Sequence, residues 1–148
     1  MTAFPLPQTT KRPLWLTLPA GAALAWNVFG LWQFGKFLNQ TPTSLMAEGM
    51  TEAQAAAYTS LPGWMTLVFA VGVLGGTLGT ALLLMQRRSA VPVLVVSLVG
   101  YVALFAGDWA HGLFDILPMQ LAILSTVVAI AAASLGLALF AFKRDILR

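Results

Sequence analysis

The sequence contains no cysteine and few charged residues. Of its 148 residues, five are acidic and eight are Lys or Arg, so charged side chains make up 9% of the chain. Without cysteine, disulfides, thiolate catalysis and sulfur-ligated metals are excluded. A water-soluble domain carries about 25% charged residues. The low charge content, together with 59% hydrophobic residues, therefore indicates a protein surrounded by lipid.

Motifs of common enzymes and nucleic-acid-binding proteins are also absent. The single histidine, His111, cannot supply paired axial ligands for haem, and there is no dinucleotide fingerprint or phosphate-binding loop. The basic residues lie at the ends of apolar runs, which is typical of membrane orientation and not of nucleic-acid binding. We therefore predict no catalytic residue, no cofactor and no nucleic-acid partner, and expect that the protein is not an enzyme.

The sequence does contain four long apolar runs. The second, residues 62–85, has no ionisable residue over 24 positions. As a helix it would be about 36 Å long, enough to cross a hydrocarbon core of about 30 Å. The sequence therefore predicts an all-α fold, a polytopic membrane four-helix bundle that forms one transmembrane domain, residues 14–142. Residues 1–13 and 143–148 are expected to be cytoplasmic tails. The expected spans are about 14–34, 62–85, 91–109 and 116–142.

The first apolar run allows two interpretations. A basic start followed by an apolar stretch and Ala23-Leu24-Ala25 is typical of a cleaved signal peptide. The apolar stretch continues through Trp26 to Phe34, however, and its 21 residues favour an uncleaved anchor that remains as the first span.

Residues 35–61 are more polar and are expected to form a loop on the outer surface. Thr41-Pro42 is typical of a helix start, with Gly49 as the stop, and Thr51 to Gln54 has the spacing of a capping box. The loop is therefore predicted to carry two short surface helices, which act either as a structured connector or as a lid or docking patch.

The distribution of charge predicts that both termini are cytoplasmic. In this orientation Lys36 is the only basic residue outside, and cytoplasmic loops carry an excess of Lys and Arg. We therefore expect a multi-pass protein of a bacterial inner membrane, with the lipid bilayer as its surroundings. The seven inner basic residues are Lys11, Arg12, Arg87, Arg88, Lys143, Arg144 and Arg148.

Small residues recur at helical spacing within each run, and in lipid such residues let helices pack closely. Asn27 lies near the middle of the first run, with Ser97 of the third run as its predicted hydrogen-bond partner. This pair is interpreted as a clamp between helices in preference to a substrate contact. A monomeric bundle accounts for the small residues most simply, and a homodimer is the alternative. The packing face of the second run is predicted to be Gly72, Gly75, Gly76 and Gly79.

Acidic residues and the histidine gather toward the outer side. Asp-x-x-His spacing can bind a divalent cation, and a histidine can sense pH or carry a proton. Helix caps and an interfacial polar cluster explain the same residues, with Gly112 ending the third helix and Asp115 capping the fourth. The residues concerned are Asp108, His111 and Asp115, spaced i, i+3 and i+7, with Glu48 and Glu52 on the same side of the membrane.

A short pattern occurs twice in the chain. Gly30-x-Trp32-x-x-Gly35-x-Phe37 recurs as Gly107-x-Trp109-x-x-Gly112-x-Phe114. Two interpretations are open: a duplicated hairpin of the kind that some transporters have, or interface aromatics and glycine caps that arose independently at two outer helix ends.

Motifs in the first three spans resemble a family of small bacterial inner-membrane proteins. Members of that family have four spans and are mostly uncharacterised, and some carry the label of sugar transporter. The resemblance implies a four-span fold and allows transport of a neutral solute. The motifs are Trp26-Asn27-x-x-Gly30, then Leu61-Pro62-Gly63-Trp64, then Gly75-x-x-x-Gly79 before Leu82-Leu83-Leu84 and the basic pair Arg87-Arg88.

Three functions are compatible with these features. The first is an accessory or assembly partner in a membrane complex, because the runs carry packing stripes and no charge at mid-membrane depth. The alternative is a small, dimeric transporter of a neutral solute such as a sugar, with Asn27 and Ser97 as polar contacts. The third is a metal- or proton-responsive site at Asp108 and His111.

Overall fold

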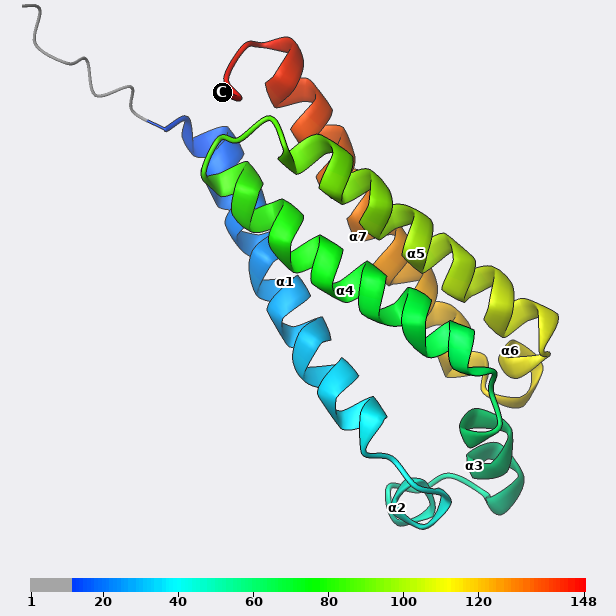
Figure 1. The fold of residues 1–148 in the computed structure, drawn as a ribbon. Helices are drawn as coiled ribbons and strands as arrows, with labels where there is room; N and C mark the ends of the chain where they lie inside the picture. The colour runs from blue at the N-terminus through cyan, green and yellow to red at the C-terminus, as the bar shows by residue number, and fades with distance from the viewer. Residues whose placement is uncertain (1–11) are drawn as a thin grey trace, which may run out of the picture.

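The structure is a computed structural model that describes residues 12–148, so the predictions for residues 1–11, including the inner position of Lys11, lie outside the described residues. Within residues 12–148 the chain is helical and has no strand. The predicted all-α four-helix bundle is confirmed (Figure 1). The helices are α1 (Leu14–Leu38), α2 (Pro42–Ala47), α3 (Glu52–Thr59), α4 (Gly63–Leu84), α5 (Ala90–Ala110), α6 (Leu113–Ile116) and α7 (Pro118–Lys143).

Four of these helices, α1, α4, α5 and α7, are long and apolar enough to cross a membrane, which makes the chain a multi-pass membrane protein. Three of them match the predicted spans to within two residues. Helix α1 instead runs four residues past its predicted end, because Gly35 stays helical. Lys36 in its last turn is favourably placed against the helix dipole and forms an ion pair with Glu48, 3.5 Å away.

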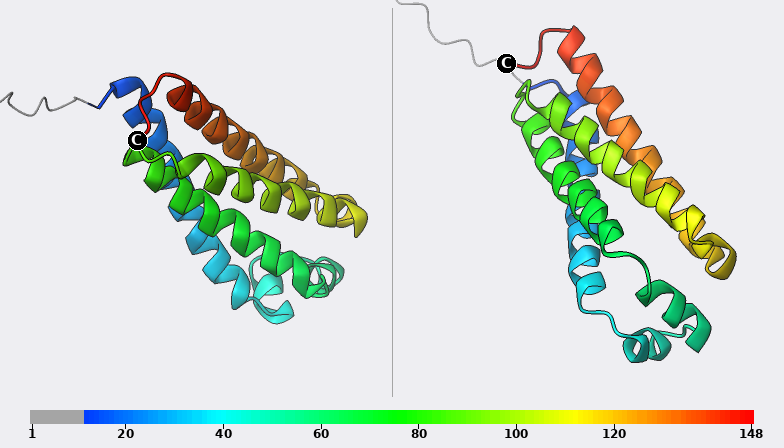
Figure 2. Two further views of the ribbon diagram at one scale, coloured as in Figure 1. Left: turned by 45° about the horizontal axis from the view of Figure 1, so that its top comes forward. Right: turned by 45° about the vertical axis from the view of Figure 1, so that its right-hand side comes forward.

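The bundle has two different ends. The cap, which consists of α2 and α3, lies with α6 at one end of the bundle, named the cap end. The other end, named the terminal end, carries Leu14, the turn between α4 and α5, and Lys143 (Figure 1). Helix α4 packs between α1 and α5, and α7 packs on α5. Helices α1 and α7 meet near the terminal end, where Trp15 contacts Phe140 edge to face at 5.3 Å, and they diverge toward the cap end (Figure 2).

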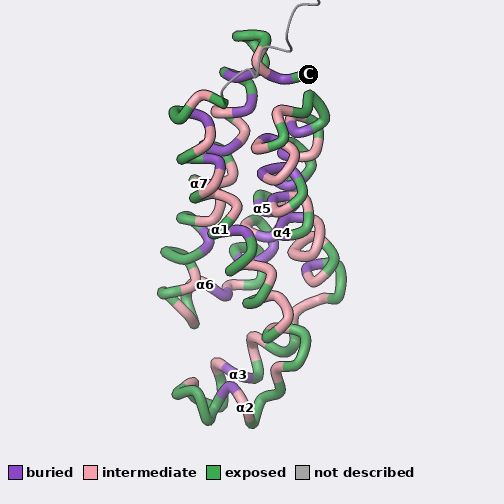
Figure 3. The backbone as a smooth tube through the Cα atoms, turned by 90° about the vertical axis from the view of Figure 1, so that its left-hand side faces the viewer, coloured by how far each residue is buried: buried purple, intermediate pink, exposed green. Residues whose placement is uncertain are grey.

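An aliphatic cluster fills the bundle at the terminal end. Its residues come from α1, α4, α5, α7 and the C-terminal segment, so it holds all four long helices together there. Figure 3 shows the buried positions on the inner faces of the helices and exposed positions on the outside. The fully buried members are Leu16, Ala20, Leu83, Ala90, Leu94, Ala138, Ala141 and Leu147.

Helices α4 and α5 approach so closely that only glycine fits at their contact. A Cβ atom built on Gly100 would lie 2.9 Å from both the backbone nitrogen of Gly72 and the carbonyl oxygen of Val68. A Cβ on Gly79 would lie 2.6 Å from the side chain of Leu94. This approach lets the Ser97 hydroxyl donate a 2.6 Å hydrogen bond to the carbonyl oxygen of Gly72, which joins the two helices.

The side chains of Asn27 and Ser97 both lie against Gly76. A Cβ on Gly76 would collide with the side-chain oxygen of Asn27 and would lie 3.2 Å from the Ser97 hydroxyl. The predicted hydrogen bond between Asn27 and Ser97 does not form, however. The Asn27 amide donates to the carbonyl oxygen of Ala23 in its own helix, 2.8 Å away, because that acceptor lies one turn back on α1.

The two short helices of the cap begin as the sequence predicts. Thr41 and Thr51 are their N-caps, and each hydroxyl accepts a 3.2 Å hydrogen bond from the backbone N–H three residues later. Gly49, with a φ of +103°, lies in the turn between them. Gln54 also donates to the carbonyl oxygen of Ile116, 3.1 Å away, so the cap reaches from the end of α1 to α6.

The end of α5 agrees with the prediction from the sequence, whereas the start of α7 does not. Gly112 ends α5 in a left-handed conformation, φ +66°, as expected. Asp115 does not cap the fourth span, because it lies inside α6, and α7 begins at Pro118 without a side-chain cap. The repeated pattern also differs in conformation, since Gly35 is helical whereas the equivalent Gly112 forms a turn.

The segment after α7 packs back on the bundle. Leu147 is buried in the aliphatic cluster, and Arg88 donates from Nε to its carbonyl oxygen at 3.0 Å. The backbone of Arg148 donates to Gln86 at 2.7 Å and accepts from the Arg88 backbone at 2.9 Å. The predicted tail 143–148 is therefore a docked segment that covers the turn between α4 and α5.

Candidate functional site

The predicted polar cluster does not assemble into a metal site. Asp108 is buried, with 1% of its surface exposed, and accepts a 3.1 Å hydrogen bond from the side-chain amide of Gln120 on α7. The side chains of the other cluster members are exposed: His111, Asp115, Glu48 and Glu52. Across residues 12–148 no group of three or more such residues is placed to hold a metal ion.

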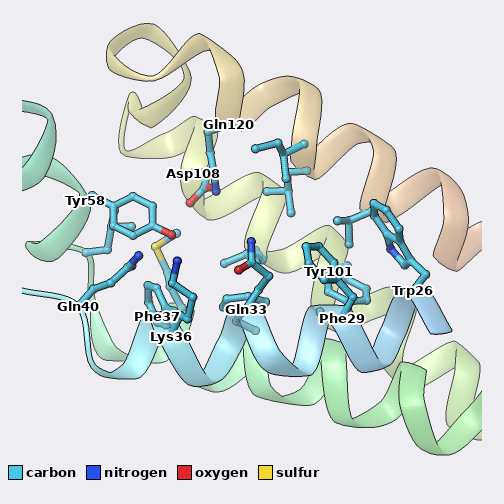
Figure 4. Close-up of a pocket in the computed structure, with 18 of the residues that line it drawn as sticks. Trp26, Phe29, Gln33, Lys36, Phe37, Gln40, Tyr58, Tyr101, Asp108 and Gln120 are labelled. Carbon is cyan, nitrogen blue, oxygen red and sulfur yellow. The ribbon is translucent and has the colours of Figure 1, made fainter. Parts of the chain in front are cut away.

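A different feature surrounds Asp108: a cavity of about 290 Å³ in the half of the bundle near the cap. Its walls come from α1, α4, α5 and α7, and α3 contributes Tyr58 from the cap (Figure 4). Toward the centre of the bundle it is apolar, with walls formed by Trp26, Phe29, Phe69, Tyr101, Leu124 and Val127. The polar side chains lie toward the cap, where Phe37, Leu61 and Met65 also line the cavity; they are Gln33, Lys36, Gln40, Glu48, Tyr58, Asp108 and Gln120.

Helical spacing brings the wall of α1 together. Trp26, Phe29, Gln33 and Phe37 recur every three or four residues, so they lie on one face. On that face Gln33 is the polar residue, and Phe37 follows it toward the cap; Lys36 and Gln40 add polar groups beside Phe37. Opposite it, Asp108 on α5 and Gln120 on α7 point across the cavity toward Gln33 (Figure 4).

The polar wall has unused hydrogen-bonding capacity. The side-chain oxygen of Gln40 is buried without a hydrogen-bond partner among the described residues, and such an atom costs free energy unless a ligand or water satisfies it. Burial, and after it the charge of Asp108, raises the pKa of Tyr58 to about 12. The phenol of Tyr58 is therefore neutral at physiological pH and can both donate and accept.

Three sides of the cavity are closed and one is open. The aliphatic cluster closes it toward the terminal end, α4 and α5 form its back, and the cap covers its polar end. Between α1 and α7 it opens sideways. Phe29 on α1 and Ile123 on α7 line the cavity, yet their side chains are 49% and 52% exposed. The opening therefore lies between two helices that span the membrane.

The polar groups of the cavity are of few kinds. Its lining contains no Ser, Thr, Cys or His within residues 12–148. Lys36 forms an ion pair with Glu48, which also lines the cavity, and its ammonium lies 5.5 Å from the centre of the Trp32 ring. The remaining polar groups are three amides, the phenols of Tyr58 and Tyr101, the indole of Trp26 and the hydrogen-bonded carboxylate of Asp108.

Sequence reasoning missed most of this site. It singled out Asp108 and Glu48, but not Gln33, Tyr58 or Gln120. Asn27, to which it assigned a polar role, lies outside the cavity lining, against Gly76. One signal was present: Gln33 and Gln120 are uncharged polar residues near the same end of two apolar runs, a position where polar groups need partners.

The chain was compared with protein-family models, with curated proteins and with solved structures, and nothing in these three comparisons matches it. The resemblance to small four-span bacterial proteins therefore depends on the motifs in the sequence alone.

Proposed function

We propose that this membrane protein is a binding protein or carrier for a small neutral ligand, which occupies the cavity between α1, α5 and α7. The observation that carries the proposal is the cavity itself, with a polar end that includes an unpartnered oxygen on Gln40. Ligand sites are typically concave and mostly apolar, with a few converging polar groups, and this cavity has that composition. The proposal favours the carrier alternative over an accessory role, and it treats the protein as a non-enzyme.

The proposal places the protein in a bacterial inner membrane with the cap outside. Support comes from the basic residues within 12–148, because six of the seven lie at the terminal end and Lys36 lies at the cap end. In this orientation the polar end of the cavity faces the periplasmic side. The six basic residues are Arg12, Arg87, Arg88, Lys143, Arg144 and Arg148.

Tryptophan fluorescence tests the proposal. The protein is placed in phosphatidylcholine nanodiscs and titrated with glucose, glycerol and monopalmitoylglycerol as neutral probes. We expect at least one probe to change the emission saturably through Trp26 on the cavity wall, and Gln120→Leu to weaken that response. The change should vanish in Trp26→Phe and persist in Trp32→Phe, a matched control because Trp32 lies outside the cavity lining. If no probe gives a saturable change that depends on Trp26, the proposal is wrong.

An accessory role is the second candidate, and one observation favours it. The outer face of α4 and α5 carries an open apolar groove of about 530 Å³. Apolar side chains that include Leu74, Leu78 and Val96 line it, which suits a helix of a partner membrane protein. Leu74→Trp would fill the groove. Purification in mild detergent should then lose a stoichiometric partner that the wild-type protein retains, and a wild-type protein that is always recovered alone would contradict this role.

A further inference from the structure

The polar side chains of the cavity gather toward the cap, whereas its inner part is mostly apolar, and this arrangement indicates a class of ligand. We infer that the ligand is a single-chain amphipath with an uncharged head, which enters from the lipid between α1 and α7. The inference rests on the proposed function, because it specifies the occupant of the same cavity. It differs from the proposed function in requiring both an alkyl chain and a route through the membrane.

The length of the two regions suits a head and part of a chain. Trp26 and Gln33 are seven residues apart on α1, which is about 10 Å along the helix axis. Over that distance the wall consists of aromatic and aliphatic side chains, including Phe29 and Leu124. An alkyl segment would lie against these side chains, while the head reaches Tyr58 and Gln120 at the polar end.

The charges at the polar end disfavour an anionic head, and the amides there suit an uncharged one. Asp108 is buried and hydrogen-bonded to Gln120, so a second carboxylate placed beside it would be repelled in a poorly solvated site. Within residues 12–148 the one cation in the lining is Lys36, and Glu48, which also lines the cavity, forms an ion pair with it. Hydroxyl or ester groups, in contrast, match the amides of Gln33 and Gln40, which donate and accept.

The route follows from where the cavity is open. The cap covers the polar end and is fixed to α6 by the hydrogen bond from Gln54 to Ile116. The exposed side chains at the opening, Phe29 and Ile123, are apolar, so the opening faces hydrocarbon. A ligand that is already dissolved in the bilayer reaches the cavity sideways without displacing the cap.

Native mass spectrometry with three probes tests the inference. The protein is incubated with monopalmitoylglycerol, palmitate or glucose and is then released from a zwitterionic detergent. Monopalmitoylglycerol has an alkyl chain and an uncharged head, palmitate has the same chain with a charged head, and glucose is uncharged and has no chain. We expect one retained monopalmitoylglycerol, binding of palmitate weaker by about tenfold, and no retained glucose. Equal binding of palmitate would overturn the uncharged head. Retention of glucose without monopalmitoylglycerol would overturn the lipid route and leave the proposed function intact, whereas retention of no probe would contradict both.

A pair of variants places the bound probe in the cavity. Ile123→Trp fills the opening between α1 and α7 and should abolish the retained monopalmitoylglycerol. Met119→Trp is the matched control on the same helix, since Met119 is 70% exposed and lies outside the cavity lining. If both variants retain the probe equally, it binds elsewhere on the protein and the inference is wrong.

Discussion

Replacing Gly100 with alanine is predicted to separate the two central helices. The new methyl group would lie 2.9 Å from the backbone nitrogen of Gly72 and from the carbonyl oxygen of Val68. Both neighbours belong to the backbone of α4, so no side-chain rotation can make room. The helices must move apart, and the 2.6 Å hydrogen bond from Ser97 to Gly72 must lengthen as they do.

The expected loss of stability follows from two opposing effects. Overpacking a well-packed contact costs about 1–3 kcal/mol, and a backbone neighbour favours the upper part of that range. Alanine in place of glycine inside a helix contributes about 0.5–1 kcal/mol in the other direction. The net destabilisation is therefore about 2 kcal/mol. Gly136→Ala on α7 is the matched control, because a Cβ added to Gly136 has no atom within 4 Å. This variant should be as stable as the wild type or more stable.

Unfolding with sodium dodecyl sulphate from mixed micelles, followed by circular dichroism, measures both variants. The transition of Gly100→Ala should occur at a lower dodecyl sulphate fraction than that of the wild type, and the transition of Gly136→Ala at an equal or higher one. If Gly100→Ala is as stable as Gly136→Ala, the close approach of α4 and α5 is not what holds these helices together, and the account of their packing is refuted.

Four further predictions concern other parts of the molecule. Because the chain lacks cysteine, Thr43→Cys should react with an impermeant maleimide on intact cells and Ser89→Cys only after lysis; the reverse pattern would invert the proposed orientation. Thr51→Ala should destabilise α3 by about 1 kcal/mol and speed amide hydrogen exchange there, whereas Thr43→Ala, outside the capping box, should not. In Tyr101→Phe the remaining tyrosine, Tyr58, should ionise with a pKa of about 12. Stability should consequently fall as the pH rises from about 10 toward 12, and ordinary titration near pH 10 would show that Tyr58 is not buried. Leu147→Ala should lower the unfolding midpoint by removing a buried side chain, and Leu139→Ala, at an exposed position on α7, should lower it less.

Several elements of the fold were predictable because local physics decides them. A long apolar run in lipid must satisfy its own backbone hydrogen bonds, so it forms a helix whatever its neighbours are. The starts of α2 and α3 were predictable for a similar reason, since Thr41 and Thr51 cap them through residues only three positions away. Helix ends were less predictable where nothing local stops the helix: Gly35 remains helical, and α1 continues to Leu38.

The predictions that failed required knowledge of distances between helices. Asn27 and Ser97 lie at similar depth, as expected, but Asn27 donates to Ala23 because an acceptor one turn away costs no rearrangement. Asp115 was assigned to the start of α7, yet a separate short helix, α6, contains it. In both cases the identity and approximate depth of the residue followed from sequence, whereas its partner did not.

The sequence by itself determined that this is a four-span helical membrane protein with a short helical cap, because hydrophobic length and capping motifs act within a few residues. Only the tertiary structure decided that α1 and α7 meet at one end and diverge at the other. That divergence leaves the cavity between them and turns Gln33, Asp108 and Gln120, which are far apart in the chain, into one polar wall. The angle between two packed helices depends on side chains from both, so no single run encodes it.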